Sequence, residues 1–193
     1  MPGSPRQTEE DKKPYPAEWD GFFDRFLKIN TEEEKRSVFN IRQAKIKDIP
    51  ALLALLSQVL EVHAVIRPDL FISGTRKYTE DELKEIVTDR NRPVFVAEED
   101  GEVLGYCFCI LQRVEQSNMK RDSMTLYVDD LCVDEKRRGQ HIGQQLTDFV
   151  TAFAREIGCY DITLNVWEGN DPALAFYRRN GFTTRKTVME KIL

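Results

Sequence analysis

The sequence has few of the residues that build metal centres and disulfide frameworks. It contains four cysteines and two histidines among 193 residues. Neither the cysteine spacing nor the histidines fit a zinc site. We therefore expect no metal, and we expect reduced, buried thiols inside the apolar runs that contain Cys107, Cys109, Cys132 and Cys159.

Long apolar runs and an excess of positive charge are also missing. We find no apolar stretch that approaches the roughly 20 residues of a membrane span, and the polar N-terminus lacks the apolar core of a signal peptide. The formal net charge is -5, which argues against a broad nucleic-acid-binding surface, although a local basic patch could exist. These absences predict a cytoplasmic protein with no membrane or nucleic-acid partner.

The first 38 residues differ from the rest of the chain. Residues 1–16 are polar and rich in proline, which predicts a flexible tail. Residues 19–27 then carry aromatic side chains at helical spacing, and Thr31 with Glu34 offers a capping box for a further short helix. The apolar helix face favours packing on the domain, and the alternative is a helix that binds a partner. We expect residues 1–38 to form a tail with a helical extension and residues 39–193 to form one domain.

From residue 39 onward, strand and helix patterns alternate. Asp48 and Pro50 predict one helix start, Thr79 with Glu82 predicts another as a capping box, and Asp100-Gly101 predicts a hairpin turn. The loop at residues 67–71 is a natural place for substrate contacts. The order predicts a mixed α/β sheet with helices on its faces, with strands at residues 41–44, 93–97, 103–114, 124–133, 161–166 and 186–192 and helices that begin near residues 50, 79, 142 and 172.

The segment from Leu131 to Gly143 runs from a strand through a basic turn into an amphipathic helix. The first amides of a helix lack internal partners and carry the positive end of the helix dipole, so such a turn can bind phosphate. Gly139 and Gly143 permit close approach, while Arg137 and Arg138 add charge. Tight strand-to-helix turns also need glycine for geometry alone, which leaves a purely structural role open. We expect the apolar face of this helix to pack in the protein core and to have no direct functional role.

A second polar segment lies near the C-terminal end. A strand ends in a loop with Asn165 and Asn170, and Pro172 then starts a helix that ends at Gly181. Tyr177 lies near the end of this helix, where it could serve either as a packed aromatic residue or as a proton donor.

Together these segments resemble the acetyl-CoA signature of the GNAT superfamily of N-acetyltransferases, an Arg/Gln-x-x-Gly-x-Gly/Ala turn followed by Asn-x-x-Ala-x-x-Phe-Tyr-x-x-x-Gly-Phe. The element order matches the family over residues 39–193. In the turn, His141 stands where the pattern has its first glycine. The turn matches Arg138, Gly139, Gln140, His141, Ile142 and Gly143, and the second half matches Asn170, Ala173, Phe176, Tyr177, Gly181 and Phe182.

The resemblance implies a mostly antiparallel α/β (α+β) sheet that splays between the strands ending at Val133 and Val166, with helices on both faces. It implies acetyl-CoA as cosubstrate, with Tyr177 as the general acid that protonates the departing thiolate after direct attack by an amine. The backbone of Leu131, Cys132 and Val133 would contact the pantetheine arm, the amides from Arg138 to Gly143 would bind the pyrophosphate, and Asn165, Asn170, Ala173, Phe176 and Tyr177 would line the other side.

An amine nucleophile must lose a proton before it attacks. Asp129 and Asp130 interrupt an apolar strand just before Leu131, and strand alternation predicts that only one of them faces the amine. Some polyamine-type members of the family carry an acidic pair at the matching place, which makes Asp129 the first choice, and a surface carboxylate is the alternative. Glu61, His63, Tyr78 and Tyr106 could also reach the acceptor pocket, but nothing in their spacing demands it.

The acceptor stays open among an aminoglycoside, a polyamine, an amino acid, a protein N-terminus and a lysine side chain. Two other functions compete with catalysis: a regulatory module that binds acyl-CoA without turnover, and an interaction domain that works through residues 16–30. Exposed strands and the aromatic extension make a homodimer an expectation.

Overall fold

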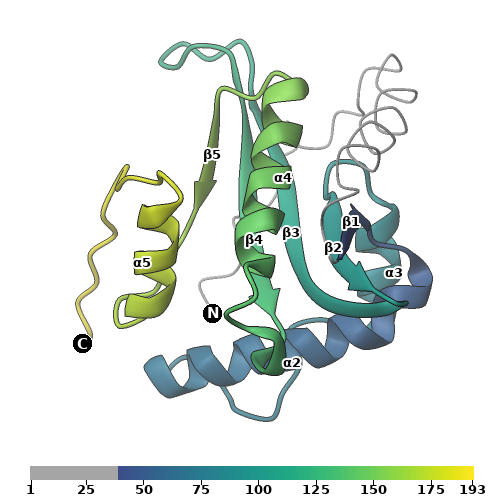
Figure 1. Ribbon diagram of the computed structural model, residues 1–193. Helices are drawn as coiled ribbons and strands as arrows, with labels where there is room; N and C mark the ends of the chain where they lie inside the picture. The colour runs from purple at the N-terminus through teal and green to yellow at the C-terminus, as the bar shows by residue number, and fades with distance from the viewer. Residues whose placement is uncertain (1–38) are drawn as a thin grey trace.

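The central sheet has five strands in the order β1-β2-β3-β4-β5 in the computed structural model, which describes residues 39–193 (Figure 1). All neighbouring strands are antiparallel except β4 and β5, which are parallel. The tail and aromatic helix expected in residues 1–38 lie outside the described residues. The strands are β1 (Asn40–Gln43), β2 (Val94–Glu99), β3 (Glu102–Val114), β4 (Ser123–Val133) and β5 (Asp161–Leu164).

Helices cover both faces of this sheet. One core cluster joins the sheet to α4, and the other joins it to α2 and α3. In Figure 1, α5 lies next to β5, at the edge of the sheet opposite β1. This is the mixed, mostly antiparallel fold that the sequence predicts. The helices are α2 (Ile49–Ile66), α3 (Glu80–Thr88), α4 (Ile142–Glu156) and α5 (Asp171–Arg179), with short 3-10 turns η3 (Ile46–Asp48) and η4 (Glu135–Arg137).

The apolar stripe of α4 explains how this helix is held on the sheet. Its buried residues recur every three or four positions, as an amphipathic helix requires. Phe149 and Phe153 each lie 5.1 Å from the ring of Phe95 on β2. These aromatic contacts pack the middle and the C-terminal half of α4 against the sheet.

All three predicted local signals lie where the sequence places them, since Asp48 is the N-cap residue of α2 and Pro50 lies in its first turn. Thr79 and Glu82 form a reciprocal capping box at the start of α3, with the Glu82 carboxylate 2.7 Å from the Thr79 amide. Asp100 and Gly101 both have positive φ, at +51° and +86°, which is the geometry of a tight hairpin turn. Asp48 differs, because its side chain makes no capping bond to α2.

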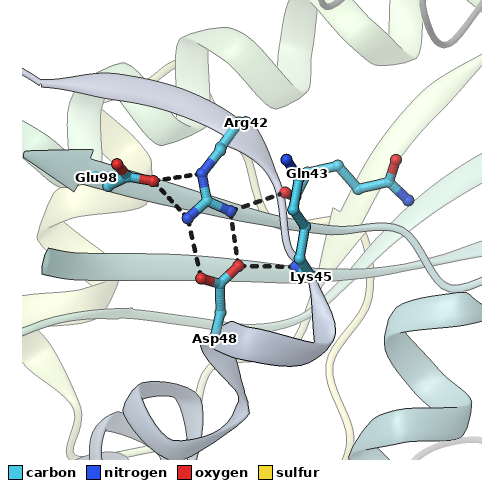
Figure 2. Close-up of polar contacts among 5 residues, drawn as sticks. All are labelled: Arg42, Gln43, Lys45, Asp48 and Glu98. Atoms are coloured by element: carbon cyan, nitrogen blue, oxygen red, sulfur yellow. Dashed lines mark hydrogen bonds and ion pairs between the residues drawn. The ribbon is translucent and has the colours of Figure 1, made fainter. Parts of the chain in front are cut away.

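The carboxylate of Asp48 instead pairs with Arg42 on β1 (Figure 2). Arg42 donates to both Asp48 oxygens at 2.6 and 2.9 Å and to Glu98 on β2 at 2.5 Å. The Lys45 amide also donates to Asp48 at 2.7 Å. Burial alone would raise the pKa of Asp48, but the bonds from Arg42 and Lys45 outweigh it and lower the pKa. This network ties β1, β2 and the start of α2 together.

The predicted closing strand at residues 186–192 is wrong. Residues 183–193 have no regular secondary structure, and β5 forms the edge of the described sheet. Side-chain ion pairs hold this segment in place of a strand ladder, since Arg185 pairs with Asp161 at 2.8 Å and Glu190 pairs with Arg67 at 2.7 Å. β5 is also shorter than predicted, ending at Leu164.

Residues 46–66, which include α2, form a helix long and apolar enough to cross a membrane by length and composition, with a mean hydropathy of 1.9. The expectation that no segment approaches such a length is therefore wrong. One helix of this kind is weak evidence for a membrane span, because core helices of soluble proteins meet the same test. Here the buried side of α2 packs in the second core cluster with Leu52, Leu55 and Leu56.

Candidate active site

The sheet opens between β4 and β5. The ladder between the two strands runs from Thr125–Asp161 to Val128–Leu164, and β4 then continues to Val133, beyond the end of β5. On its other side this stretch of β4 stays paired with β3. The result is the predicted splay, with one backbone edge of residues 130–133 facing the opening, where a ligand can form hydrogen bonds.

The side chains of Leu131, Cys132 and Val133 are committed to packing. Leu131 and Val133 pack against the core under α4, while Cys132 is buried in the core under α2. The Cys132 thiol lies 3.6 Å from the Leu55 carbonyl, and burial, with the nearby Asp130 charge, raises its pKa to about 12. This segment therefore offers its backbone rather than its side chains, in agreement with the contact predicted for the pantetheine arm.

The turn between β4 and α4 presents free amide groups. Gly139 and His141 have positive φ, at +80° and +61°, and α4 starts at Ile142. The residues from Arg138 to His141 are exposed, and the first amides of α4 have no carbonyl partner within the helix. A φ of +61° is easiest for glycine, which explains the glycine of the family pattern at the position of His141. Histidine keeps the same turn here at some conformational cost.

The two halves of the signature meet at Gly143. A β-carbon built on Gly143 would lie 3.5 Å from the ring of Phe176 on α5 and 3.5 Å from a methyl group of Val133 on β4. Larger side chains at this position would push these elements apart. The start of α4, the end of β4 and the inner side of α5 therefore lie against one another, as a shared binding site requires.

Two of the predicted cofactor-binding side chains already have partners within the chain. Asn165 donates to the Tyr127 hydroxyl at 3.0 Å, and the Asn170 side chain accepts from the Ala173 amide at 3.3 Å. Asn170 is therefore the N-cap of α5. The amides and carbonyls of this loop stay candidates for cofactor contacts.

Tyr177 faces the opening between β4 and β5. It borders a small cavity under α4 and packs 5.5 Å from the ring of Phe182. Burial raises the pKa of Tyr177, and the nearby Cys107 thiol and Asp130 charge raise it further. The phenol therefore keeps its proton at neutral pH. The cavity is lined by Cys107, Val128, Leu131, Thr147, Val150, Thr151, Ile162, Tyr177 and Phe182.

Asp129 and Asp130 lie together rather than on opposite faces, so the alternation prediction is wrong. The reason is an irregularity in the β3–β4 ladder: Cys109 pairs with Val128 and Phe108 with Asp130, which leaves Asp129 as an extra residue. Such a bulge breaks the two-residue period of side-chain direction. Both carboxylates therefore reach the same amine, the Lys77 ammonium, at 3.1 Å, and both side chains are only 6% exposed.

The sequence reasoning missed Lys77 and left Tyr78 aside. Tyr78 donates to Asp129 at 3.2 Å and stacks over Phe108. Burial alone would lower the pKa of Lys77, but the charges of Asp130 and Asp129 outweigh it and raise the pKa. Lys77 is therefore an ammonium ion at neutral pH. No periodic pattern marks it, because it lies in the irregular loop between α2 and α3.

Two of the other residues that were set aside, His63 and Tyr106, lie near the acidic pair. Burial lowers the pKa of His63 more than the Asp130 charge raises it, so this ring is neutral at pH 7. Tyr106 is fully buried, and burial with the Asp130 charge raises its pKa well above the usual value. Glu61 is occupied elsewhere, because it accepts from Ser73 and Gly74.

The loop at residues 67–71 contacts the segment that follows β5. The Arg67 guanidinium lies 5.7 Å from the centre of the Trp167 ring, and Phe71 packs edge-on against the same ring at 5.4 Å. Phe71 also contacts His63 at 5.2 Å. The predicted substrate loop thus connects α2 with the loop before α5.

Comparison with known proteins gives one family for this arrangement. The model of the acetyltransferase (GNAT) family matches residues 59–182. The chain is 28% identical over 144 residues to an uncharacterized N-acetyltransferase of Bacillus subtilis, covering 74% of this chain and 89% of that protein. It is 27% identical over 163 residues to an N-alpha-acetyltransferase of Sulfurisphaera tokodaii, covering 81% of this chain and 87% of that protein.

A solved structure is also similar. A mutant of the BH1408 protein from Bacillus halodurans superposes with a TM-score of 0.76 and is 30% identical, covering 79% of this chain and 98% of that chain. The family match spans the splayed strands, the exposed amide turn and the helix that carries Tyr177.

Proposed function

Because the chain belongs to the GNAT acetyltransferase family, we propose that it transfers an acetyl group from acetyl-CoA to a primary amine. Family members generally use acetyl-CoA, and the curated relatives described above are named as N-acetyltransferases. The observation that carries the proposal is the junction at Gly143, where the free amides of α4, the edge of β4 that faces the opening and the helix of Tyr177 meet.

The residues present fit the cosubstrate. The amides from Arg138 to Gly143 would hold the pyrophosphate, because the helix dipole favours an anion there. The backbone edge at Leu131–Val133 would hydrogen-bond to the pantetheine amides, and Ala173 and Phe176 would line the opposite side. The thioester would then lie near the cavity that Tyr177 borders.

The chemistry requires only direct attack. The neutral amine forms a bond to the thioester carbonyl, and a backbone amide near Leu131 stabilises the negative oxygen. Collapse breaks the carbon–sulfur bond, and Tyr177 protonates the departing thiolate. The Tyr177 phenol holds its proton at neutral pH, as a general acid must before the thiolate leaves.

A carboxylate of the acidic pair would accept the proton that the amine loses. Asp129 was preferred from the sequence, but two observations favour Asp130: it pairs with β3 inside the ladder, and its charge acts on both Tyr177 and Tyr106. Asp129 accepts from Tyr78 at the bulge. We assign the role of general base to the pair. Within the pair we favour Asp130, because its charge acts on Tyr177.

The first experiment is isothermal titration of the protein with acetyl-CoA, comparing wild type with His141→Glu. A carboxylate at position 141 would repel the pyrophosphate, and we expect a loss in affinity of about tenfold or more. His141→Gly is the matched control, because it keeps the positive φ without adding charge. Equal affinities in all three proteins would contradict the pyrophosphate site.

A screen of primary amines for thiol release then tests turnover. Acetyl-CoA binding without turnover on any amine would favour the regulatory module over the enzyme.

We also propose that the protein is cytoplasmic and acts without membrane or nucleic acid.

A homodimer is part of the proposal. Exposed apolar side chains near the C-terminus support it, and light scattering measures it directly. These side chains are Val188, Met189, Ile192 and Leu193.

A further inference from the structure

The Lys77 ammonium lies in a site shaped for an alkylammonium ion. Its nitrogen is 3.1 Å from one oxygen of Asp129 and 3.1 Å from one oxygen of Asp130. Tyr78 donates to the same Asp129 oxygen at 3.2 Å and so orients it. Two carboxylates around one nitrogen match the several donors of an ammonium group.

The acidic pair needs a cation, but nothing in its geometry demands that the cation be Lys77. Two adjacent buried carboxylates are costly unless a positive charge compensates them. Any ammonium ion that reaches the pair can meet this need. Lys77 is the more exposed member of the cluster, with 30% of its side chain accessible against 6% for each aspartate.

The position of the pair connects this site to the reaction. Asp130 immediately precedes Leu131, the first residue of the proposed pantetheine segment, and its charge acts on Tyr177. An amine held by the pair therefore lies beside the stretch of β4 that is proposed to contact the pantetheine arm. Lys77 occupies the position that the acceptor amine would have to take.

Lys77 can leave this position without a change in the fold. Its loop is anchored on both sides, by the Gly74 amide bonded to Glu61 at 2.7 Å and by the capping box of Thr79. The lysine side chain between these anchors is long and flexible, so it can swing away while the backbone stays in place.

We propose that Lys77 is an internal occupant of the acceptor site and that the acceptor is a primary alkylammonium ion that displaces it. This inference rests on the proposed acetyltransferase function. The bound ammonium gives one proton to the acidic pair, and its nitrogen bonds to the acetyl carbon. The carbon–sulfur bond then breaks, and the thiolate takes a proton from Tyr177. The second proton of the nitrogen returns to the Tyr177 phenolate, and the acidic pair releases its proton to water. The amide product has no charge, so Lys77 returns to the carboxylates and expels it.

The test uses Lys77→Ala, which removes three carbons and the nitrogen, and n-propylammonium, which supplies them. We expect n-propylammonium to bind Lys77→Ala about tenfold or more tightly than wild type, and to raise its melting temperature. n-Propanol, the neutral analogue, should do neither. Lys77→Arg is the matched control that keeps the cation, and it should show no gain.

With acetyl-CoA added, Lys77→Ala should form N-propylacetamide about tenfold or more faster than wild type, as measured by mass spectrometry. Equal binding of n-propylammonium to variant and wild type would overturn the proposal. So would tight binding without acetylation in a variant that binds acetyl-CoA. If Lys77→Ala folds poorly, Lys77→Ser leaves nearly the same space and gives the same comparison.

The two proposals fail in different ways. If neither wild type nor variant binds acetyl-CoA, the proposed function is wrong, whatever n-propylammonium does. If both bind acetyl-CoA and the variant gains nothing for n-propylammonium, only the role of Lys77 is wrong.

Discussion

The phenol of Tyr177 lies at the open end of the sheet with a raised pKa, in a cavity bordered by core side chains. We predict that Tyr177→Phe lowers kcat about 100-fold or more, because loss of a general acid typically costs that much. Acetyl-CoA affinity should change little, since the hydroxyl acts after binding. Steady-state kinetics with isothermal titration separates the two effects.

A matched variant is Tyr127→Phe, which removes a hydroxyl that accepts from Asn165, the residue that follows β5. We expect a much smaller loss of kcat than for Tyr177→Phe. Equal losses in the two variants would argue that Tyr177 serves packing rather than proton transfer.

Single residues show where sequence reasoning succeeds and where it stops. The turn at Gly139 and the position of Tyr177 follow from short motifs whose spacing is fixed by local geometry. The shared direction of Asp129 and Asp130 does not, because a bulge breaks the period on which the prediction relied. Lys77 could not be found either, since its partners are more than 50 residues away and its loop has no periodicity.

At the scale of elements, the network around Asp48 joins two strands to a helix (Figure 2). We predict that Asp48→Asn lowers the free energy of unfolding by about 3 kcal/mol, because it leaves the largely buried guanidinium of Arg42 with one partner fewer. Urea unfolding at pH 7 measures this. A change below about 0.5 kcal/mol would show that Glu98 alone satisfies Arg42.

The same network predicts that the free energy of unfolding falls at acid pH. The pKa of Asp48 is lowered in the folded state, so its contribution is present above the unfolded value, near 3.8, and is lost as the pH falls through the folded value. Wild type should therefore lose stability below about pH 4 more steeply than Asp48→Asn. Parallel curves for the two proteins would contradict the lowered pKa.

Gly105 on β3 controls the position of the cofactor segment. A β-carbon at this position would lie 2.7 Å from the Cys132 carbonyl, which is too close to be tolerated without a shift of β4. We predict that Gly105→Ala destabilises the protein by about 1–3 kcal/mol and weakens acetyl-CoA binding. The control is Gly101→Ala at the hairpin turn, where a β-carbon meets no neighbour but φ is +86°. It should lower stability through strain while leaving the affinity unchanged.

Element boundaries were predictable where one local signal fixes them. The capping box at Thr79 and the hairpin at Asp100-Gly101 satisfy their own hydrogen bonds and lie where expected. The closing strand was not predictable from its residues, because a strand needs a partner as well as a β-forming sequence. Residues 183–193 are held by two long-range ion pairs, which leave no periodic trace in the sequence.

At the scale of the whole molecule, the buried cysteine thiols limit the stability of the fold at alkaline pH. Burial is the first cause that raises the pKa of the thiols of Cys132 and Cys159, each to about 12. A folded pKa above the unfolded value means that the stabilisation is complete below the unfolded pKa and is lost as the pH rises toward the folded one. Cys107 and Cys109 are also buried, with their sulfurs 3.7 Å apart.

We therefore predict that the free energy of unfolding falls between about pH 9 and pH 12, with about 2 kcal/mol lost by pH 10.5 through Cys132 alone. Unfolding in urea along a pH series measures the fall, and Cys132→Ala should show a shallower one because it has no proton to lose. Loss of packing also lowers the stability of that variant at pH 7, so the comparison is between slopes rather than absolute values. Identical slopes would mean that the Cys132 thiol ionises in the folded protein as easily as in the unfolded chain. The backbone of the cofactor segment would then be open to water on the α2 side, and the site could not be closed around a thioester in the way proposed.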